Sequence, residues 1–184
     1  MRILAISGSL RRGSHNTSLL RAVEELLPPG DELVLWDGLR EVPPYDEDAE
    51  AEPAPAAVAS LRAAVAEADA VLISTPEYNA SLPGALKNAL DWASRPFASN
   101  PFRSKPVAVI GASAGIFGAV WAQAELRKVL GTMGARVAEV EVAVGRAAEK
   151  FDADGRLVDD EVREQLVDTL AELQLELEHV AVAV

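Results

Sequence analysis

The chain has 184 residues, 49% hydrophobic and 25% charged, a size and composition typical of a globular protein with one full-sized core. Acidic residues outnumber basic ones by 29 to 17, and the resulting formal charge of -12 disfavours nucleic acid as a partner, because phosphate backbones would be repelled. The chain has no cysteine and two histidines, which excludes disulfides, thiolate metal sites and cysteine nucleophiles and disfavours a zinc site.

No apolar run approaches the roughly 20 residues that a membrane-spanning helix needs. The start, MRILAIS, also lacks the basic residues, long apolar segment and cleavage site of a signal peptide. We therefore expect a cytoplasmic protein without a membrane partner. Because neither an internal repeat nor a linker interrupts the sequence, residues 1–184 are predicted to form a single domain.

Strand and helix patterns alternate along the first half of the chain. RILAIS (2–7) is a short apolar run, and residues 16–27 carry leucines and a valine at helical spacing. DELVLWD (31–37) alternates apolar and polar residues, as a strand does. An alanine-rich helix is predicted over 54–68, and AVLIST (70–75) is typical of a buried strand.

The second half continues the alternation. A helix is predicted from Pro83 in its first turn to about Ser94, followed by the strand KPVAVIGAS (105–113) and a helix over about 117–131. RVAEVEVAV (136–144) alternates strictly, which indicates an edge strand with one wet face. The last helix is predicted to begin near Asp159 and to carry an apolar stripe.

Five strands alternating with helices predict an α/β fold, a parallel sheet covered on both faces. The one long polar connection, EVPPYDEDAEAEPAP (41–55), is predicted to be a surface loop, and either flanks an active site or contacts a partner.

Three predicted loops share one edge of this sheet. They are GSLRRGSHN (8–16), TPEYNASLPG (75–84) and GASAGIFG (111–118). Ligands of open parallel sheets bind beyond the carboxyl ends of the strands, where these loops emerge. All three are rich in residues that expose backbone amides or hydroxyls, which favours a bound phosphorylated planar cofactor.

The first loop leads into a helix N-terminus, which favours an anion. Ser9, Ser14 and Asn16 can donate hydrogen bonds, and Arg11 can add a charged fork suited to phosphate. The loop matches neither a Walker motif nor G-x-G-x-x-G. A capped turn with solvated arginines is the alternative for this loop taken alone.

The second loop places Pro76, Glu77, Tyr78 and Asn79 directly after a strand. Its backbone can face the polar edge of a flat heterocycle, with Tyr78 as an apolar wall. An ordinary turn with solvated Glu77 and Asn79 is the alternative.

In the third loop, Ser113 and Gly115 are placed where a ring could pass close to the backbone. For this loop alone, a helix N-cap by Ser113 is the favoured alternative.

G-S-x-R-x-x-S-x-N in the first loop, paired with P-E-Y-N-x-S-x-P-G-x-L-K-N in the second, resembles the NADPH-dependent FMN reductase family of flavodoxin-like proteins, relatives of chromate and quinone reductases and of azoreductases. The resemblance weakens after about residue 145. It implies a flavodoxin-like three-layer sandwich with a five-stranded parallel sheet in the order 2-1-3-4-5.

The resemblance also implies which residues contact FMN. Those implied for the phosphate are Ser9, Arg11, Ser14 and Asn16. Those implied for the isoalloxazine ring are Pro76, Glu77, Tyr78, Asn79, Ser113 and Gly115. His15 occupies a position that is often aromatic in the family, and its backbone N–H is expected to matter more than its ring.

Members of the family are commonly homodimers or homotetramers, with the helix from Pro83 to Trp92 near a subunit interface. Lys87, Asp91 and Trp92 are candidates for that contact. A solvated Lys–Asp pair and a core tryptophan form the alternative.

The resemblance implies an NAD(P)H-dependent FMN oxidoreductase that takes hydride from NADPH or NADH and reduces quinones, flavins, azo compounds or metal oxyanions such as chromate. No catalytic side chain and no metal are expected, because the flavin N5 carries the chemistry. Two alternatives stay open: a flavodoxin-type electron carrier without NAD(P)H activity, and a non-catalytic flavodoxin-like scaffold. Arg11 argues against the carrier, because flavodoxins usually bind the phosphate through a loop of threonines and serines.

Overall fold

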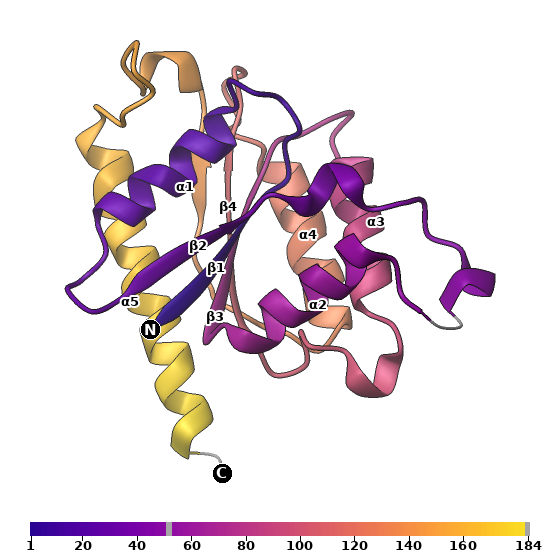
Figure 1. Cartoon of the computed structure of the whole chain (residues 1–184). Helices are drawn as coiled ribbons and strands as arrows, with labels where there is room; N and C mark the ends of the chain where they lie inside the picture. The colour runs from indigo at the N-terminus through magenta and orange to yellow at the C-terminus, as the bar shows by residue number, and fades with distance from the viewer. Residues whose placement is uncertain (51–52, 183–184) are drawn as a thin grey trace.

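A parallel β-sheet with helices on both faces forms the centre of the computed structural model, which describes residues 1–50 and 53–182 (Figure 1). Two residues of the acidic segment 41–55 and the last two of the chain lie outside this described part. The strands are β1 (Arg2–Ser7), β2 (Glu32–Trp36), β3 (Ala70–Thr75), β4 (Pro106–Ala112), β5 (Arg136–Val137) and β6 (Val142–Val144). The helices are α1 (His15–Glu25), α2 (Ala56–Glu67), α3 (Gly84–Ala93), α4 (Val120–Thr132) and α5 (Asp160–Val182).

The sheet has the predicted order β2-β1-β3-β4-β5, and every strand pair in it is parallel. The flavodoxin-like arrangement expected from the sequence is therefore confirmed. The sheet of the described residues has six strands rather than five, because β6 also pairs with β4.

The additional strand arises where one edge strand was predicted over 136–144. Glu139 and Glu141 are exposed and Ala138 and Val142 are buried, so the predicted alternation of faces holds. The pairing with β4 nevertheless breaks between Val137 and Val142. The prediction of one continuous strand was wrong because a side chain enters the ladder: the Arg127 guanidinium donates to the carbonyls of Val109 in β4 and Val140 in the break.

Successive residues of each strand face two separate cores. Ile3 and Ala5 of β1 pack with α1 and α5, whereas Leu4 and Ile6 pack with α2, α3 and α4. Figure 1 shows these two helix layers on opposite sides of the sheet. Every residue of β3 and β4 is buried, as the near-continuous apolar runs of both strands predict.

Helix α5 packs through the apolar stripe predicted for it. Val162, Leu166, Leu170 and Leu173 are buried, and Leu177 near the end is half-buried. Within the described ranges, none of the helices combines the length and apolarity that crossing a membrane would require.

The acidic segment 41–55 is anchored on α3 through its N-terminal part. The Pro43 carbonyl accepts hydrogen bonds from Asn88 Nδ2 at 2.8 Å and Trp92 Nε1 at 2.9 Å, and Asn88 Oδ1 accepts from the Tyr45 N–H. The ring of Trp92 meets that of Tyr45 edge-on and is 1% exposed. Of the two interpretations of Trp92, the core tryptophan is therefore the one that holds, because this segment covers it.

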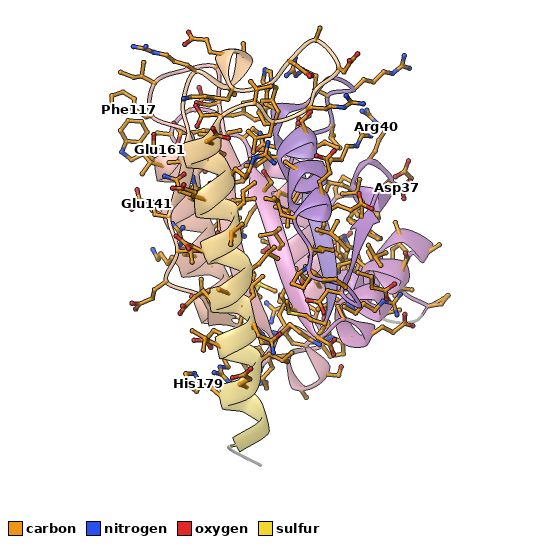
Figure 2. The ribbon with its side chains drawn as sticks, turned by 90° about the vertical axis from the view of Figure 1, so that its left-hand side faces the viewer. Asp37, Arg40, Phe117, Glu141, Glu161 and His179 are labelled. Carbon is orange, nitrogen blue, oxygen red and sulfur yellow. The ribbon has the colours of Figure 1, made fainter. Side chains whose placement is uncertain are left out.

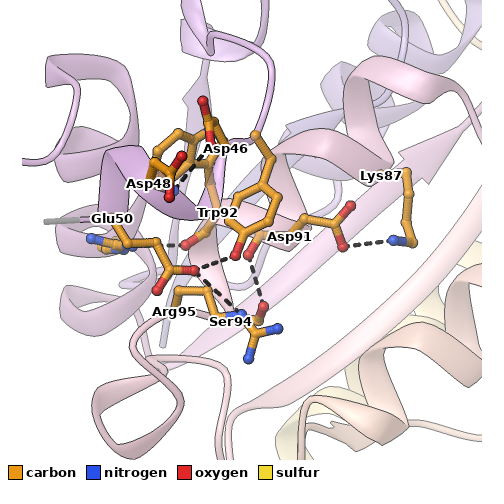
Figure 3. A network of polar contacts seen from close by, with 10 residues as sticks. Asp46, Asp48, Glu50, Lys87, Asp91, Trp92, Ser94 and Arg95 are labelled. Atoms are coloured by element: carbon orange, nitrogen blue, oxygen red, sulfur yellow. Dashed lines mark hydrogen bonds and ion pairs between the residues drawn. The ribbon is translucent and has the colours of Figure 1, made fainter.

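The charged side chains around this contact pair with one another (Figure 3). Glu50 accepts a hydrogen bond from the Tyr45 hydroxyl and lies 3.6 Å from the Arg95 guanidinium. Also on α3, directly before Asn88 and Trp92, Lys87 and Asp91 form a half-exposed ion pair of 2.6 Å. This is the pair considered above as an alternative to a subunit contact, and a role for it in assembly stays a prediction.

Candidate functional site

The three predicted loops meet in one open cleft of about 330 Å³ at the carboxyl ends of β1, β3 and β4. Its lining residues are Ser9, Arg11, Ser14, His15, Asn16, Pro76, Glu77, Tyr78, Ala112, Ser113 and Ala114. All predicted site residues except Asn79 and Gly115 are in this lining. Residues more than 100 positions apart in the sequence therefore come together because parallel strands end at the same edge.

Helix α1 points its N-terminus into the cleft. Ser14 is the N-cap, and its hydroxyl accepts a hydrogen bond from the Thr17 N–H. The first turn contains no acidic residue. The N–H groups of His15 and Asn16 are at helix positions that have no acceptor within the helix. With the exposed Arg11 beside them, these groups suit a phosphate.

The Asn16 side chain is used mainly inside the protein. Its Oδ1 accepts from the Ser74 hydroxyl and the Ala112 N–H, and its Nδ2 donates to the Ala112 carbonyl. The side chain thus joins the start of α1 to the ends of β3 and β4. One amide hydrogen remains for a ligand, so this residue braces the cleft at least as much as it could contact an anion.

His15 lies between the phosphate-binding loop and the C-terminal part of the chain. Its ring stacks on Phe151, with centroids 5.8 Å apart and planes inclined by 22°. Burial lowers the pKa of His15, and the positive charge of Arg11 lowers it further. The imidazole is therefore held neutral near pH 7 and presents an aromatic surface to Phe151. The expectation that the backbone N–H of His15 matters more than its ring stays a prediction.

The second loop forms a tight hairpin. Tyr78 and Ser81 exchange two backbone hydrogen bonds, and the two residues between them, Asn79 and Ala80, have φ values of 55° and 58°. Positive φ at both central residues is the requirement of a type I′ turn. Asn79 is therefore at an exposed tip beside the cleft rather than in its lining.

Glu77 is bound to α4 rather than solvated. Its Oε2 accepts hydrogen bonds from the N–H groups of Trp121 and Ala122, both at 3.0 Å. Ala119 is the residue at the N-cap of α4, and it provides no side-chain cap. Ser113 lies six residues earlier and donates to the Gly115 carbonyl, so the alternative of a helix cap by Ser113 was wrong.

The third loop is braced by a segment that the sequence interpretation missed, residues 143–147. Ser113 N donates to the Val144 carbonyl, Ala147 N donates to the Ser113 carbonyl, and Arg146 N donates to the Gly115 carbonyl. A Cβ on Gly145 would lie 2.3 Å from the Ile116 carbonyl oxygen, so this close approach requires glycine. Gly145, directly after the alternating stretch 136–144, was the available signal.

Arg40 is a second feature without a sequence prediction. Its guanidinium donates to the Leu10 carbonyl at 2.6 Å and borders a smaller cleft, of about 190 Å³, on the other side of the first loop. Ser9 and Arg11 line both clefts. In Figure 2, Arg40 lies at the loop end of the molecule, and Phe117 lies on the opposite flank.

The larger cleft fits a phosphorylated planar group. A phosphate would meet Arg11 and the N-terminus of α1, and a ring would meet the mostly apolar and backbone surface of Pro76, Tyr78 and Ser113. Among the described residues, no cluster of three or more histidine and carboxylate side chains could hold a metal ion.

Comparison with known proteins agrees with these features. A sequence model of the NADPH-dependent FMN reductase family matches residues 1–149. An NAD(P)H-dependent FMN reductase from Pseudomonas aeruginosa is 46% identical over 95% of this chain and 94% of its own. A 2-hydroxy-1,4-benzoquinone reductase from a Burkholderia species is 36% identical over 90% of both.

A solved structure supports the same relationship. The flavoenzyme NAD(P)H:(acceptor) oxidoreductase FerB from Paracoccus denitrificans superposes with a TM-score of 0.87 at 36% identity, covering 97% of each chain. Fold, sequence and cleft agree: the chain belongs to the NADPH-dependent FMN reductase family, oxidoreductases that use FMN together with a nicotinamide cofactor.

Proposed function

We propose that this protein holds FMN in the three-loop cleft, reduces it with NADPH or NADH and passes the electrons to quinones. The observation that carries the proposal is the convergence of Arg11, the N-terminus of α1 and two further loops on one open cleft. When bound, FMN would supply both the hydride acceptor and the electron donor for the second substrate.

The phosphate would be held by the first loop. Arg11 would provide a charged fork, and Ser9 and Ser14 hydroxyl donors. The N–H groups of His15 and Asn16 would add the favourable end of the α1 dipole. This local positive potential would oppose the repulsion from the chain's formal charge of -12.

The ring would lie between the second and third loops. Pro76, Tyr78 and Ser113 would provide surface and backbone polar groups, with Asn79 and Gly115 at the margin. Among the residues that line this space, His15 stacks on Phe151 and Glu77 binds the first turn of α4. We therefore assign the protein the tasks of binding, orientation and access rather than side-chain acid–base catalysis.

Quinones are the acceptors we favour, because the similar Burkholderia protein is named a benzoquinone reductase. Exposed Tyr78 at the cleft mouth gives a flat aromatic acceptor a surface to contact. Free flavins, azo compounds and chromate remain candidate acceptors. A homodimer or homotetramer, a cytoplasmic location and a single domain over 1–184 also stay predictions.

The first test is the absorption spectrum of the purified protein, with the released chromophore identified after heat denaturation. NADPH and NADH oxidation is then measured with and without a benzoquinone. Bound FMN with quinone-dependent turnover supports the proposal. Bound FMN without turnover favours an electron carrier, and failure to bind added FMN favours a scaffold.

The chain provides a matched pair of variants. Arg11 lines the cleft and the neighbouring Arg12 is exposed outside it. Arg11→Ala should weaken FMN binding at least tenfold, as expected for loss of a charge-assisted hydrogen bond to phosphate. Arg12→Ala removes the same charge and should change the dissociation constant by less than about twofold. Equal effects would mean that only the general positive potential of the loop matters.

A further inference from the structure

We propose that Glu77 is a positioning residue: its carboxylate fastens the hairpin loop, residues 76–81, to the first turn of α4 and thereby sets where the flavin ring lies. The inference rests on the proposed FMN site and gives Glu77 a task other than contact with the cofactor. It also accounts for an acidic side chain beside a site that binds an anion.

The contact replaces a helix cap that α4 lacks. Helix α4 starts at Val120 after Ala119, a buried residue with φ 63° whose methyl group cannot cap. Trp121 and Ala122 are the second and third residues of the helix, and their N–H groups are those that an N-cap side chain normally satisfies. Glu77 Oε2 accepts from both at 3.0 Å, across 44 and 45 positions of sequence.

A second contact fastens the other end of the hairpin loop to the same helix. The Ser81 hydroxyl donates to Glu125 Oε2 at 2.5 Å, one turn along α4 from Trp121. Between these two contacts the loop is a closed hairpin with Asn79 and Ala80 at positive φ. The hairpin is therefore held at both ends, and its position follows that of α4.

The charge of Glu77 is compensated where it stands. A carboxylate at a helix N-terminus interacts favourably with the helix dipole, and the Glu77 oxygen accepts hydrogen bonds from two N–H groups. An uncompensated carboxylate at this place would oppose an anionic ligand and a ring that gains electrons. Because Glu77 caps α4, its negative charge can lie beside the cleft without repelling an anionic ligand.

The test uses variants that separate the length of the side chain at position 77 from its charge. Gln at position 77 keeps the length and an accepting oxygen without the charge, and Asp keeps the charge but is one methylene shorter. Glu77→Gln should therefore bind FMN within about threefold of the unmodified protein, and Glu77→Asp and Glu77→Ala should bind about tenfold more weakly. Glu164→Ala, which removes one exposed carboxylate from α5, is the control for net charge.

Binding of two different flavins shows whether a variant affects the ring or the phosphate part of the site. Fluorescence-quenching titrations of the flavin-free protein with FMN and with riboflavin, which lacks the phosphate, should show equal loss of affinity for both in Glu77→Ala. Arg11→Ala should lose affinity for FMN alone. If Glu77→Gln weakened flavin binding as much as Glu77→Ala, the charge rather than the cap would matter, and the proposal would be overturned. An unchanged riboflavin affinity in Glu77→Ala would also overturn it.

Amide hydrogen exchange measures the cap without any flavin. The amides of Trp121 and Ala122 should exchange faster in Glu77→Ala and Glu77→Asp than in Glu77→Gln. Unchanged exchange in a folded Glu77→Ala protein would overturn the proposal even if FMN binds. Should the protein bind no FMN at all, the proposed function fails, while the exchange rates still decide whether Glu77 caps α4.

Discussion

The Ser74 hydroxyl donates a buried hydrogen bond of 2.8 Å to Oδ1 of Asn16, 58 positions earlier in the chain. The same oxygen accepts the Ala112 N–H, and the Asn16 amide donates to the Ala112 carbonyl. One side chain thus ties the end of β3 and the end of β4 to the first turn of α1. The relative placement of the loops that form the cleft therefore depends on the side-chain amide of Asn16, which provides both the donor and the acceptor of these hydrogen bonds.

Replacing Asn16 by Asp should destabilise the fold although the shape is preserved. The substitution would set a carboxylate oxygen against the Ala112 carbonyl and remove the donor, with an expected loss of about 1–3 kcal/mol in the free energy of unfolding. Urea denaturation at pH 7 measures it. Asn79→Asp makes the same change at the exposed hairpin tip and should stay within about 0.5 kcal/mol. Equal effects at both positions would contradict the bracing role of Asn16.

The pH dependence of stability should contain a contribution from His15. The pKa of His15 is lowered by burial and by Arg11, so the unfolded chain takes up the proton at a higher pH than the folded protein does. Stability should therefore fall as the pH decreases below the ordinary histidine pKa of 6.5 towards the lower folded value. His15→Phe keeps an aromatic ring against Phe151 and should remove this part of the decline. Urea midpoints at pH 8 and pH 5.5 provide the comparison.

Phosphate should reverse the shift of His15. An anion bound at the N-terminus of α1 would favour the imidazolium, so inorganic phosphate should raise the pKa of His15. The ring proton signals followed by NMR measure this directly, and the spectrum of His15→Phe assigns them, since His179 is the only other histidine. If the pKa of His15 does not change when phosphate is added, the anion does not bind beside His15.

Ala80 is an alanine where glycine is expected. Its φ of 58° is in the left-handed region, which costs a residue with a Cβ about 1–2 kcal/mol. Ala80→Gly should therefore stabilise the protein by about 0.5–1 kcal/mol, after the larger backbone entropy of glycine in the unfolded state is subtracted. Ala63→Gly, at an exposed position within α2, should instead destabilise it by about 1 kcal/mol. Thermal unfolding of both variants checks the two opposite signs.

The sequence predicted the parts of this protein that depend on local pattern. The strand at Ala70–Thr75 lies where the apolar run placed it, and the meeting of three loops at one edge follows from parallel topology. The order of the sheet was implied by the family resemblance and is confirmed. Residue types predicted that the first loop binds an anion, since a loop of serines and an arginine before a helix is suited to few other groups, and this stays a prediction.

Contacts between residues far apart in the sequence could not be predicted from local patterns. Nothing near Val140 indicates that Arg127 of a preceding helix would enter the ladder and divide the strand. Glu77 looked like a solvated or ligand-facing residue because its partners, the N–H groups of α4, are more than 40 positions away. Trp92 is covered by Pro43 and Tyr45, a segment that composition alone placed only on the surface.

Asp159 carries a pH-dependent contribution to stability at the start of α5. Its Oδ1 accepts the Val162 N–H at 3.0 Å, as an N-cap does, and its Oδ2 pairs with Lys150 Nζ at 2.5 Å. The hydrogen bond from Lys150 lowers the pKa of Asp159, and the backbone hydrogen bond from Val162 lowers it further. Because the folded pKa is below the ordinary value of 3.8, this contribution is fully present above that value and is lost as the pH falls through the folded pKa.

Two substitutions should separate the cap of α5 from the ion pair. Asp159→Ala removes both and should cost about 1 kcal/mol for the cap alone at pH 7. Asp159→Asn keeps an oxygen for the Val162 N–H, so it should be the more stable of the two at pH 7. Both variants should lose less stability than the unmodified protein between pH 5 and pH 2, because neither has a carboxylate to protonate at this position. Urea midpoints across that range measure how steeply stability falls with pH. If Asp159→Asn lost stability as steeply as the unmodified protein, other carboxylates would be responsible for the acid-induced loss.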